Sequence, residues 1–149
     1  MKIGFYPGSF SPWHEGHGDV LEKALKVFDK IVILQLTNTD KGEAEPLDWA
    51  DVVVGYDDGK RVELVHRKDV SIIEAVGTYI LGEQKVGLSL QYAIVRGLRN
   101  ERDFCDEQIL NYWYEDLGIK MPIVYFIADR SLVHISSSAI KAANKFTEK

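Results

Sequence analysis

The chain has 149 residues, 46% hydrophobic and 28% charged, so it can close one core as a single domain (1–149) without disulfides or a structural metal. Its 18 basic and 23 acidic side chains give a net charge of −5, which argues against broad binding to nucleic acid or to an anionic membrane. A single cysteine, an N-terminus interrupted by Pro7 and Gly8, and the lack of a long apolar run predict a cytoplasmic protein without signal peptide or membrane span.

The first part of the chain predicts a strand, a helix and a second strand. The strands are the apolar runs Lys2–Tyr6 and Ile31–Thr37. The helix between them carries apolar residues at spacings of three and four, namely Val20, Leu21, Ala24, Leu25 and Phe28. One helix face therefore packs on the sheet, while Glu22, Lys23 and Lys26 face water.

The segment between Asn38 and Lys60 fits two interpretations. A helix can begin at Pro46, whereas the run Val52–Val54 favours a strand that would turn back at Asp58-Gly59. We favour a short helix here.

The rest of the chain continues the alternation of strands and helices. The predicted strands are Arg61–His66, Tyr92–Arg96 and Ile123–Ile127, and the predicted helices are Ser71–Leu81, Glu101–Tyr114 and Ser137–Asn144. Ser136 or Ser137 is a natural N-cap for the last helix. With right-handed crossovers, the fold class is α/β: a single Rossmann-like, doubly wound sheet of five parallel strands. Its ligand cleft is expected beyond the carboxyl ends of the strands.

Three segments that follow strand ends carry residues suited to binding phosphate. The loop Gly8–His17 places two imidazoles, His14 and His17, beside a turn that leads into a helix N-terminus. The run Val95–Arg99 sets two arginines around a glycine, and each guanidinium can bind a pair of phosphate oxygens. The run Ile135–Ser138 offers hydroxyls and free N–H groups where the last helix begins. Together the three segments predict a cradle for a polyphosphate.

Each of these segments has a simpler interpretation when it is taken alone. His14 and His17 also fit a zinc site, but no third Cys, His or carboxylate stands in a matching position. Arg96 and Arg99 also fit ion pairs with surface carboxylates such as Asp103. The phosphate-binding hypothesis therefore depends on the three segments occurring together.

These segments resemble the phosphopantetheine adenylyltransferases of the HxGH nucleotidyltransferase superfamily. The similar motifs are Gly8-Ser9-Phe10 with His14-x-Gly16-His17, Val95–Arg99 with Asp103-Phe104, and Ile135–Ser138. The resemblance implies transfer of AMP from ATP to 4′-phosphopantetheine, giving dephospho-coenzyme A and pyrophosphate in coenzyme A biosynthesis. It also implies a homo-oligomer, usually a hexamer, and Mg²⁺ held mainly through the ATP phosphates.

The resemblance also implies roles for individual residues. The catalytic set is His17, Lys41 and Arg99, which would align the phosphates and stabilise the charge that develops on them. The residues implied to bind the acceptor substrate are Ser9, Lys41, Ser71 and Arg96. The residues implied to bind ATP are Ser9, Phe10, His14, His17, Gly97, Leu98, Arg99, Glu107, Leu132, Val133, His134, Ile135, Ser136, Ser137 and Ser138.

Two residues of the first loop leave the acceptor open. Ser11 stands where the family usually has aspartate, and His14 stands where it often has threonine. The loop therefore also resembles nicotinate-nucleotide adenylyltransferases. An adenylyltransferase acting on nicotinamide or nicotinate mononucleotide, another HxGH nucleotidyltransferase, and a catalytically silent, regulatory nucleotide-binding protein are the alternatives.

Overall fold

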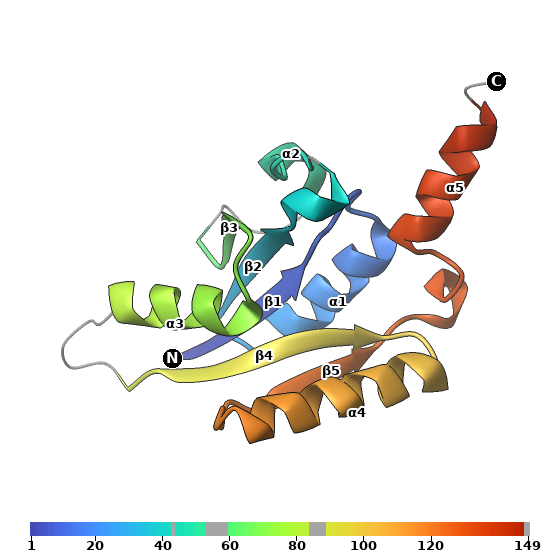
Figure 1. The fold of residues 1–149 in the computed structure, drawn as a ribbon. Helices are drawn as coiled ribbons and strands as arrows, with labels where there is room; N and C mark the ends of the chain where they lie inside the picture. The colour runs from blue at the N-terminus through green and yellow to red at the C-terminus, as the bar shows by residue number, and fades with distance from the viewer. Residues whose placement is uncertain (43, 53–59, 84–88, 148–149) are drawn as a thin grey trace.

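The computed structural model describes residues 1–42, 44–52, 60–83 and 89–147. In these residues one sheet of five parallel strands has the order β3-β2-β1-β4-β5 (Figure 1). The strands are β1 (Lys2–Gly8), β2 (Lys30–Thr37), β3 (Val62–Lys68), β4 (Gln91–Leu98) and β5 (Ile123–Ile127). The predicted Rossmann-like sheet is therefore confirmed.

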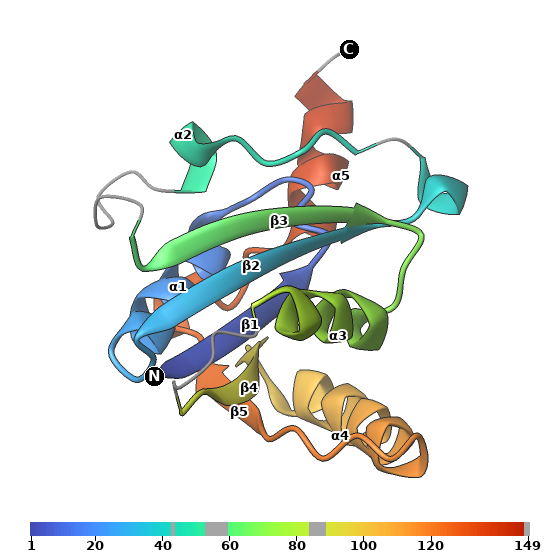
Figure 2. The same cartoon turned by 90° about the vertical axis from the view of Figure 1, so that its left-hand side faces the viewer.

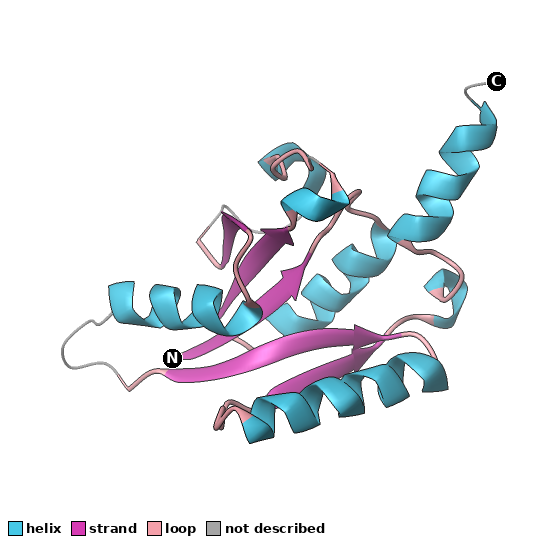
Figure 3. Cartoon of the chain, in the orientation of Figure 1, coloured by secondary structure: helices cyan, strands magenta, loops and turns pink. Residues whose placement is uncertain are grey.

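Helices lie on both faces of this sheet (Figures 2 and 3). The helices are α1 (Glu15–Leu25), α2 (Trp49–Val52), α3 (Ile72–Gly82), α4 (Glu101–Asp116) and α5 (Ser137–Thr147). The side chains of α1 and α2 belong to one buried cluster and those of α3 to a second. Helix α5 projects away from the sheet (Figure 1).

Strand β2 shows why the sheet needs helices on both sides. Ile31 and Ile33 are fully buried in the cluster that contains α1, and Val32 and Leu34 are fully buried in the cluster that contains α3. Successive side chains of a strand point to opposite faces, so a continuous apolar run must be covered twice. This strand lies next to the central strand β1 and carries the core of the molecule on both faces.

The predicted elements are all present, with differences at their ends. β1 and β4 each continue two residues further than expected, to Gly8 and Leu98. Helix α1 ends at Leu25, because Lys26 caps it and the chain turns towards β2, so Phe28 reaches the same core from the turn.

The short helix expected to begin at Pro46 is present as α2, but it begins three residues later, at Trp49. The alternative strand beyond Val52 and its turn at Asp58-Gly59 lie outside the described residues. In the described ranges no helix combines the length and the apolar character needed to cross a bilayer.

Gly4 lies in the middle of β1 where no side chain fits. A Cβ at this position would lie 2.8 Å from Ile31 Cδ1 and 2.9 Å from Val95 Cγ2, and both of those side chains are fully buried. Replacing Gly4 with alanine should therefore lower the free energy of unfolding by about 1–3 kcal/mol, as measured by urea denaturation. The control is Gly77→Ala in α3, where a Cβ would have no neighbour within 4 Å. Equal destabilisation by both variants would contradict the prediction.

Candidate active site

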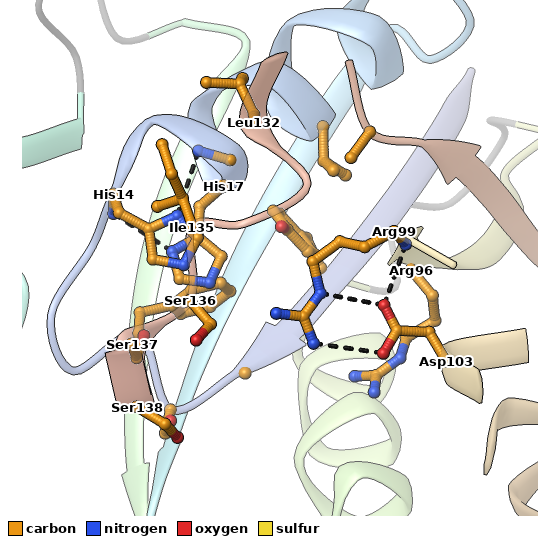
Figure 4. A pocket seen from close by; sticks show the side chains of 18 of the residues that line it. His14, His17, Arg96, Arg99, Asp103, Leu132, Ile135, Ser136, Ser137 and Ser138 are labelled. Atoms are coloured by element: carbon orange, nitrogen blue, oxygen red, sulfur yellow. Dashed lines mark hydrogen bonds and ion pairs between the residues drawn. The ribbon is translucent and has the colours of Figure 1, made fainter. Parts of the chain in front are cut away.

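A cavity of about 480 Å³ lies at the carboxyl ends of the strands and collects all three predicted phosphate-binding segments (Figure 4). The predicted site residues that line it are Ser9, Phe10, His14, His17, Arg96, Gly97, Arg99, Glu107, Leu132, Ile135, Ser136, Ser137 and Ser138. Residues that the sequence did not indicate also line it, among them Val20 and Ala128. Segments more than 100 residues apart thus share one pocket, as the strand order requires.

Five predicted site residues do not line this cavity. Lys41 is exposed in a single turn of 3₁₀-helix (Thr39–Lys41) after β2, and His134 is exposed after a second such turn (Arg130–Leu132). Ser71 caps α3, where its Oγ accepts a hydrogen bond from the Glu74 N–H. The other two are Leu98 and Val133. The roles given to these five stay predictions.

Aromatic packing holds the loop between β1 and α1 in shape. Phe10 is buried with φ 48°, a left-handed conformation that is uncommon for a residue other than glycine. Its ring lies 5.1 Å from that of Tyr6 and 5.2 Å from that of Trp13. The rings of Phe10 and Trp13 both contact the His17 ring, at 4.9 Å and 5.2 Å. Trp13 therefore packs against the other rings of this loop.

His14 and His17 form a stacked pair at the start of α1. Their ring centroids are 3.7 Å apart. His14 Nδ1 accepts a hydrogen bond from the Gly16 N–H at 3.1 Å, and His17 Nδ1 accepts one from the His14 N–H at 3.2 Å (Figure 4). Because each Nδ1 accepts, the proton of each neutral ring lies on Nε2. Both rings thereby have an Nε2–H donor to offer a ligand in the cavity.

The surroundings keep both imidazoles neutral. Burial is the main cause that lowers the pKa of His17 to about 3, and the nearby His14 and Arg99 lower it further. Burial, followed by the charge of Arg99, also lowers the pKa of His14. Neutral rings with a fixed tautomer can donate hydrogen bonds to phosphate without titrating near pH 7.

The depressed pKa of His17 predicts that the protein loses stability in mild acid. In the unfolded chain a histidine binds its proton near pH 6.5, but folded His17 binds it only near pH 3. The unfolded state therefore binds more protons between these values, so stability that is present above pH 6.5 is lost progressively as the pH falls towards 3. His17 alone should contribute a slope of up to about 1.4 kcal/mol per pH unit. Urea denaturation at pH 7, 6 and 5 should show a shallower slope for His17→Asn, and an unchanged slope would contradict the prediction.

The two arginines after β4 have different partners. The Arg99 guanidinium binds Asp103 in a bidentate manner, with Nε at 2.9 Å from Oδ2 and Nη2 at 3.1 Å from Oδ1 (Figure 4). This pair confirms the carboxylate partner suggested by the sequence. The hydrogen bonds that Arg99 donates to the Asp103 carboxylate are the first cause that raises the pKa of Arg99. Asp103 thus holds the guanidinium in place at the wall of the cavity.

Arg96 is bound to the buried residue Glu107, a contact that the sequence did not predict. Glu107 Oε1 lies 2.6 Å from Nη2 and 2.9 Å from Nε of Arg96, and Nη1 donates to the Pro7 carbonyl at 3.2 Å. Burial opposes the charge of Arg96, but the Glu107 carboxylate outweighs it and the pKa of Arg96 is raised. Glu107 Oε2 is buried with no hydrogen-bond partner among the described residues.

Two sets of contacts fasten the wall made by the chain beyond β5. Ser136 Oγ accepts from the Ala139 N–H, so Ser136 rather than Ser137 caps α5, and Ser137 Oγ donates to the Pro12 carbonyl at 3.0 Å. Lys23 Nζ binds Asp19 at 2.8 Å and Asp129 at 3.1 Å. Lys23, predicted to face water, keeps 29% of its side chain exposed, and it also joins α1 to the loop after β5 through these two carboxylates.

Comparisons with known proteins agree with this architecture. A model of the cytidylyltransferase-like family matches residues 5–143. Phosphopantetheine adenylyltransferase of Mycoplasma capricolum subsp. capricolum is 32% identical over 95% of this chain and 95% of its own length. The enzyme of the same name from Syntrophomonas wolfei subsp. wolfei is 32% identical over 96% of this chain and 83% of its own.

The fold likeness extends to more distant proteins. A bifunctional NMN adenylyltransferase/ADP ribose pyrophosphatase of Francisella tularensis, solved with AMP and a manganese ion, superposes with a TM-score of 0.62 at 15% identity. The match covers 95% of this chain and 41% of that one, and at this identity it supports the fold alone. From the family model and the near full-length relatives, the chain belongs to the cytidylyltransferase-like family and, within it, to the phosphopantetheine adenylyltransferases.

Proposed function

We infer that this chain is a nucleotidyltransferase that moves AMP from ATP to 4′-phosphopantetheine, giving dephospho-coenzyme A and pyrophosphate in coenzyme A biosynthesis. The observation that carries this function is the match, over almost the whole chain, to phosphopantetheine adenylyltransferases. The cavity supports it, because imidazoles, guanidinium groups and hydroxyls from three segments line one space.

We propose that the triphosphate of ATP lies between the His14–His17 pair, Arg99 and the serines at the start of α5. An oxygen of the acceptor phosphate attacks the α-phosphorus in line, and the bond from that phosphorus to the bridging oxygen breaks, with its electron pair leaving on pyrophosphate. His17 Nε2–H donates to the α-phosphate as negative charge builds there. The protein supplies alignment and hydrogen bonds and needs no covalent nucleophile.

The acceptor phosphate is assigned to the side of the cavity that holds Arg96. Arg96 is anchored by Glu107 and by the Pro7 carbonyl, so its guanidinium is already positioned before a ligand arrives. We propose that Lys41, Ser9 and Ser71 complete this side. Lys41 is exposed at the carboxyl end of β2, where a long side chain can turn towards an incoming phosphate.

The proposal extends to a metal ion and to assembly. No group of three or more His, Cys, Asp or Glu side chains in the described residues is placed to hold a metal, and Asp103 and Glu107 are bound to arginines. Because both carboxylates of the cavity wall are already bound to arginines, we propose that Mg²⁺ enters with ATP. The phosphates would hold most of its coordination sites, and the ion would neutralise their charge. Exposed Tyr112 and Trp113 on α4 support a homo-oligomer, which we propose to be a hexamer.

Pyrophosphate release tests the function and its alternatives. Purified protein with ATP and Mg²⁺ should release pyrophosphate with 4′-phosphopantetheine and far less with nicotinamide or nicotinate mononucleotide. Faster release with either mononucleotide would favour the alternative acceptor, which Ser11 and His14 of the first loop leave open. ATP binding by calorimetry without turnover on any acceptor would instead indicate the silent nucleotide-binding protein.

A further inference from the structure

Gln35 is a polar side chain buried in an apolar part of the core. It lies on β2, two residues after Ile33 and on the same face, and only 2% of its surface is exposed. Ile33 and Leu47 lie beside it around a small cavity of about 110 Å³. An amide in such surroundings is costly unless its polar atoms are hydrogen-bonded. Its partners therefore indicate why glutamine stands here.

The Gln35 amide binds two separate segments of backbone. Nε2 donates to the Ser9 carbonyl at 3.2 Å and to the Glu45 carbonyl at 3.0 Å, and Oε1 accepts from the Leu47 N–H at 2.8 Å. Both N–H donors of the amide are thus used. Gly8 is the partner of Gln35 in the β1–β2 register, so Ser9 is the first residue beyond the paired strands. Gln35 joins the start of the His14–His17 loop to the chain that follows β2.

The hydrogen bond to Ser9 fixes the plane of the peptide between Ser9 and Phe10. The Ser9–Phe10 peptide bond is trans, because the cis peptide bond in the described residues is Ser11-Pro12. In a trans peptide the C=O and N–H point in opposite directions, so the Phe10 N–H points away from Gln35. Ser9 and Phe10 both line the large cavity, and Phe10 adopts its left-handed φ of 48° directly after this peptide. A rotated peptide plane would withdraw the donor and release that strained conformation.

We propose that Gln35 is a positioning residue that orients the Phe10 N–H as a hydrogen-bond donor to the reacting phosphates. The inference rests on the proposed nucleotidyl transfer. Gln35 touches no substrate, since it acts from the core through the Ser9 carbonyl. It also binds this loop to Glu45 and Leu47, so the phosphate-binding loop and the segment after β2 hold a common position.

A nearly isosteric substitution tests the role of the amide. Gln35→Met keeps the volume and removes all three hydrogen bonds, and it should lower kcat at least about tenfold with a smaller change in KM for ATP, because a misaligned donor weakens transition-state binding. The matched control is Ile33→Val, which removes buried volume beside the same small cavity but leaves all three hydrogen bonds of Gln35 in place. Both are assayed well below their melting temperatures. The proposal would be overturned if kcat of Gln35→Met fell by less than about tenfold, or if kcat fell equally in both variants.

A second measurement uses the wild-type protein, so it does not depend on whether a variant folds. In the wild-type protein labelled with ¹⁵N-phenylalanine, the Phe10 amide should show the largest shift of the six phenylalanine amides when ATP is added. A Phe10 amide that does not respond to bound ATP would overturn the proposal even if Gln35→Met is unfolded. The same sample tests turnover separately. Pyrophosphate release that fails with every acceptor refutes the proposed reaction, while the amide response still tests whether the Phe10 N–H meets the phosphates of ATP, on which the role proposed for Gln35 depends.

Discussion

Replacing His17 with alanine should lower kcat by about 10²–10³ while KM for ATP changes little. The His17 ring is seated by Phe10 and Trp13, its tautomer is set by the His14 N–H, and its lowered pKa keeps it neutral. Its Nε2–H is thus a preorganised donor, and such a donor matters most when charge develops on the phosphate. Steady-state kinetics of pyrophosphate release with both substrates varied would measure the two constants.

The His17 prediction separates a role in the transition state from a role in ground-state binding. Calorimetry of the alanine variant should give an affinity for ATP close to that of the wild type. A loss of affinity as large as the loss of rate would instead mean that His17 binds the ground state equally well. Because His17 stays neutral from about pH 5 upwards, its titration adds no inflection to the pH profile of kcat in that range. The profiles of the wild type and the variant should therefore have the same shape.

Replacing Glu107 with alanine should lower the free energy of unfolding by about 3 kcal/mol. The side chains of Arg96 and Glu107 are only 25% and 11% exposed, so the variant leaves a guanidinium charge inside the protein without its carboxylate. Asp103→Ala is the matched control, since it breaks an ion pair to Arg99, whose side chain is 39% exposed and can reach water. The control should lose about 1 kcal/mol or less. Urea denaturation of both variants would measure the difference.

The Glu107 prediction has a second part that reports on the acceptor site. Inorganic phosphate or 4′-phosphopantetheine should raise the melting temperature of Glu107→Ala more than that of the wild type, because an anion can replace the missing carboxylate beside Arg96. The prediction would fail if Glu107→Ala lost no more stability than Asp103→Ala, or if phosphate raised the melting temperatures of variant and wild type equally. Either result would show that Glu107 is not needed to stabilise the charge of Arg96.

The sequence predicted the features that depend on the spacing of apolar residues and on the order of the motifs along the chain. β5 begins and ends where expected, at Ile123 and Ile127, because a short apolar run between turn residues leaves little freedom. The three motifs meet because parallel strands place their carboxyl ends at one edge of a sheet. The family assignment follows from the same motifs and is confirmed by the relatives.

Side-chain partners far apart in the chain were not predictable in this way. The Arg96–Glu107 pair joins a strand to the second turn of the next helix, and the contact of Lys23 with Asp129 spans 106 residues. Periodicity shows which face of an element a side chain is on, but not which neighbour it meets there, since that depends on the register and crossing of the packed elements. Gln35 is the clearest case, because a single polar residue in an apolar strand gives no sign of the backbone groups it binds.

The bond from Lys23 to the Ile127 carbonyl, and that from Ser137 to the Pro12 carbonyl, connect the earliest part of the chain to its last quarter. During synthesis on the ribosome, the histidine loop therefore emerges long before the wall that faces it. A nascent chain that ends before β5 lacks the pocket wall that runs from Ala128 to Ser138, and closing the pocket requires contacts of high sequence separation, which form slowly. Nucleotide binding should consequently begin only once the whole sheet has been completed.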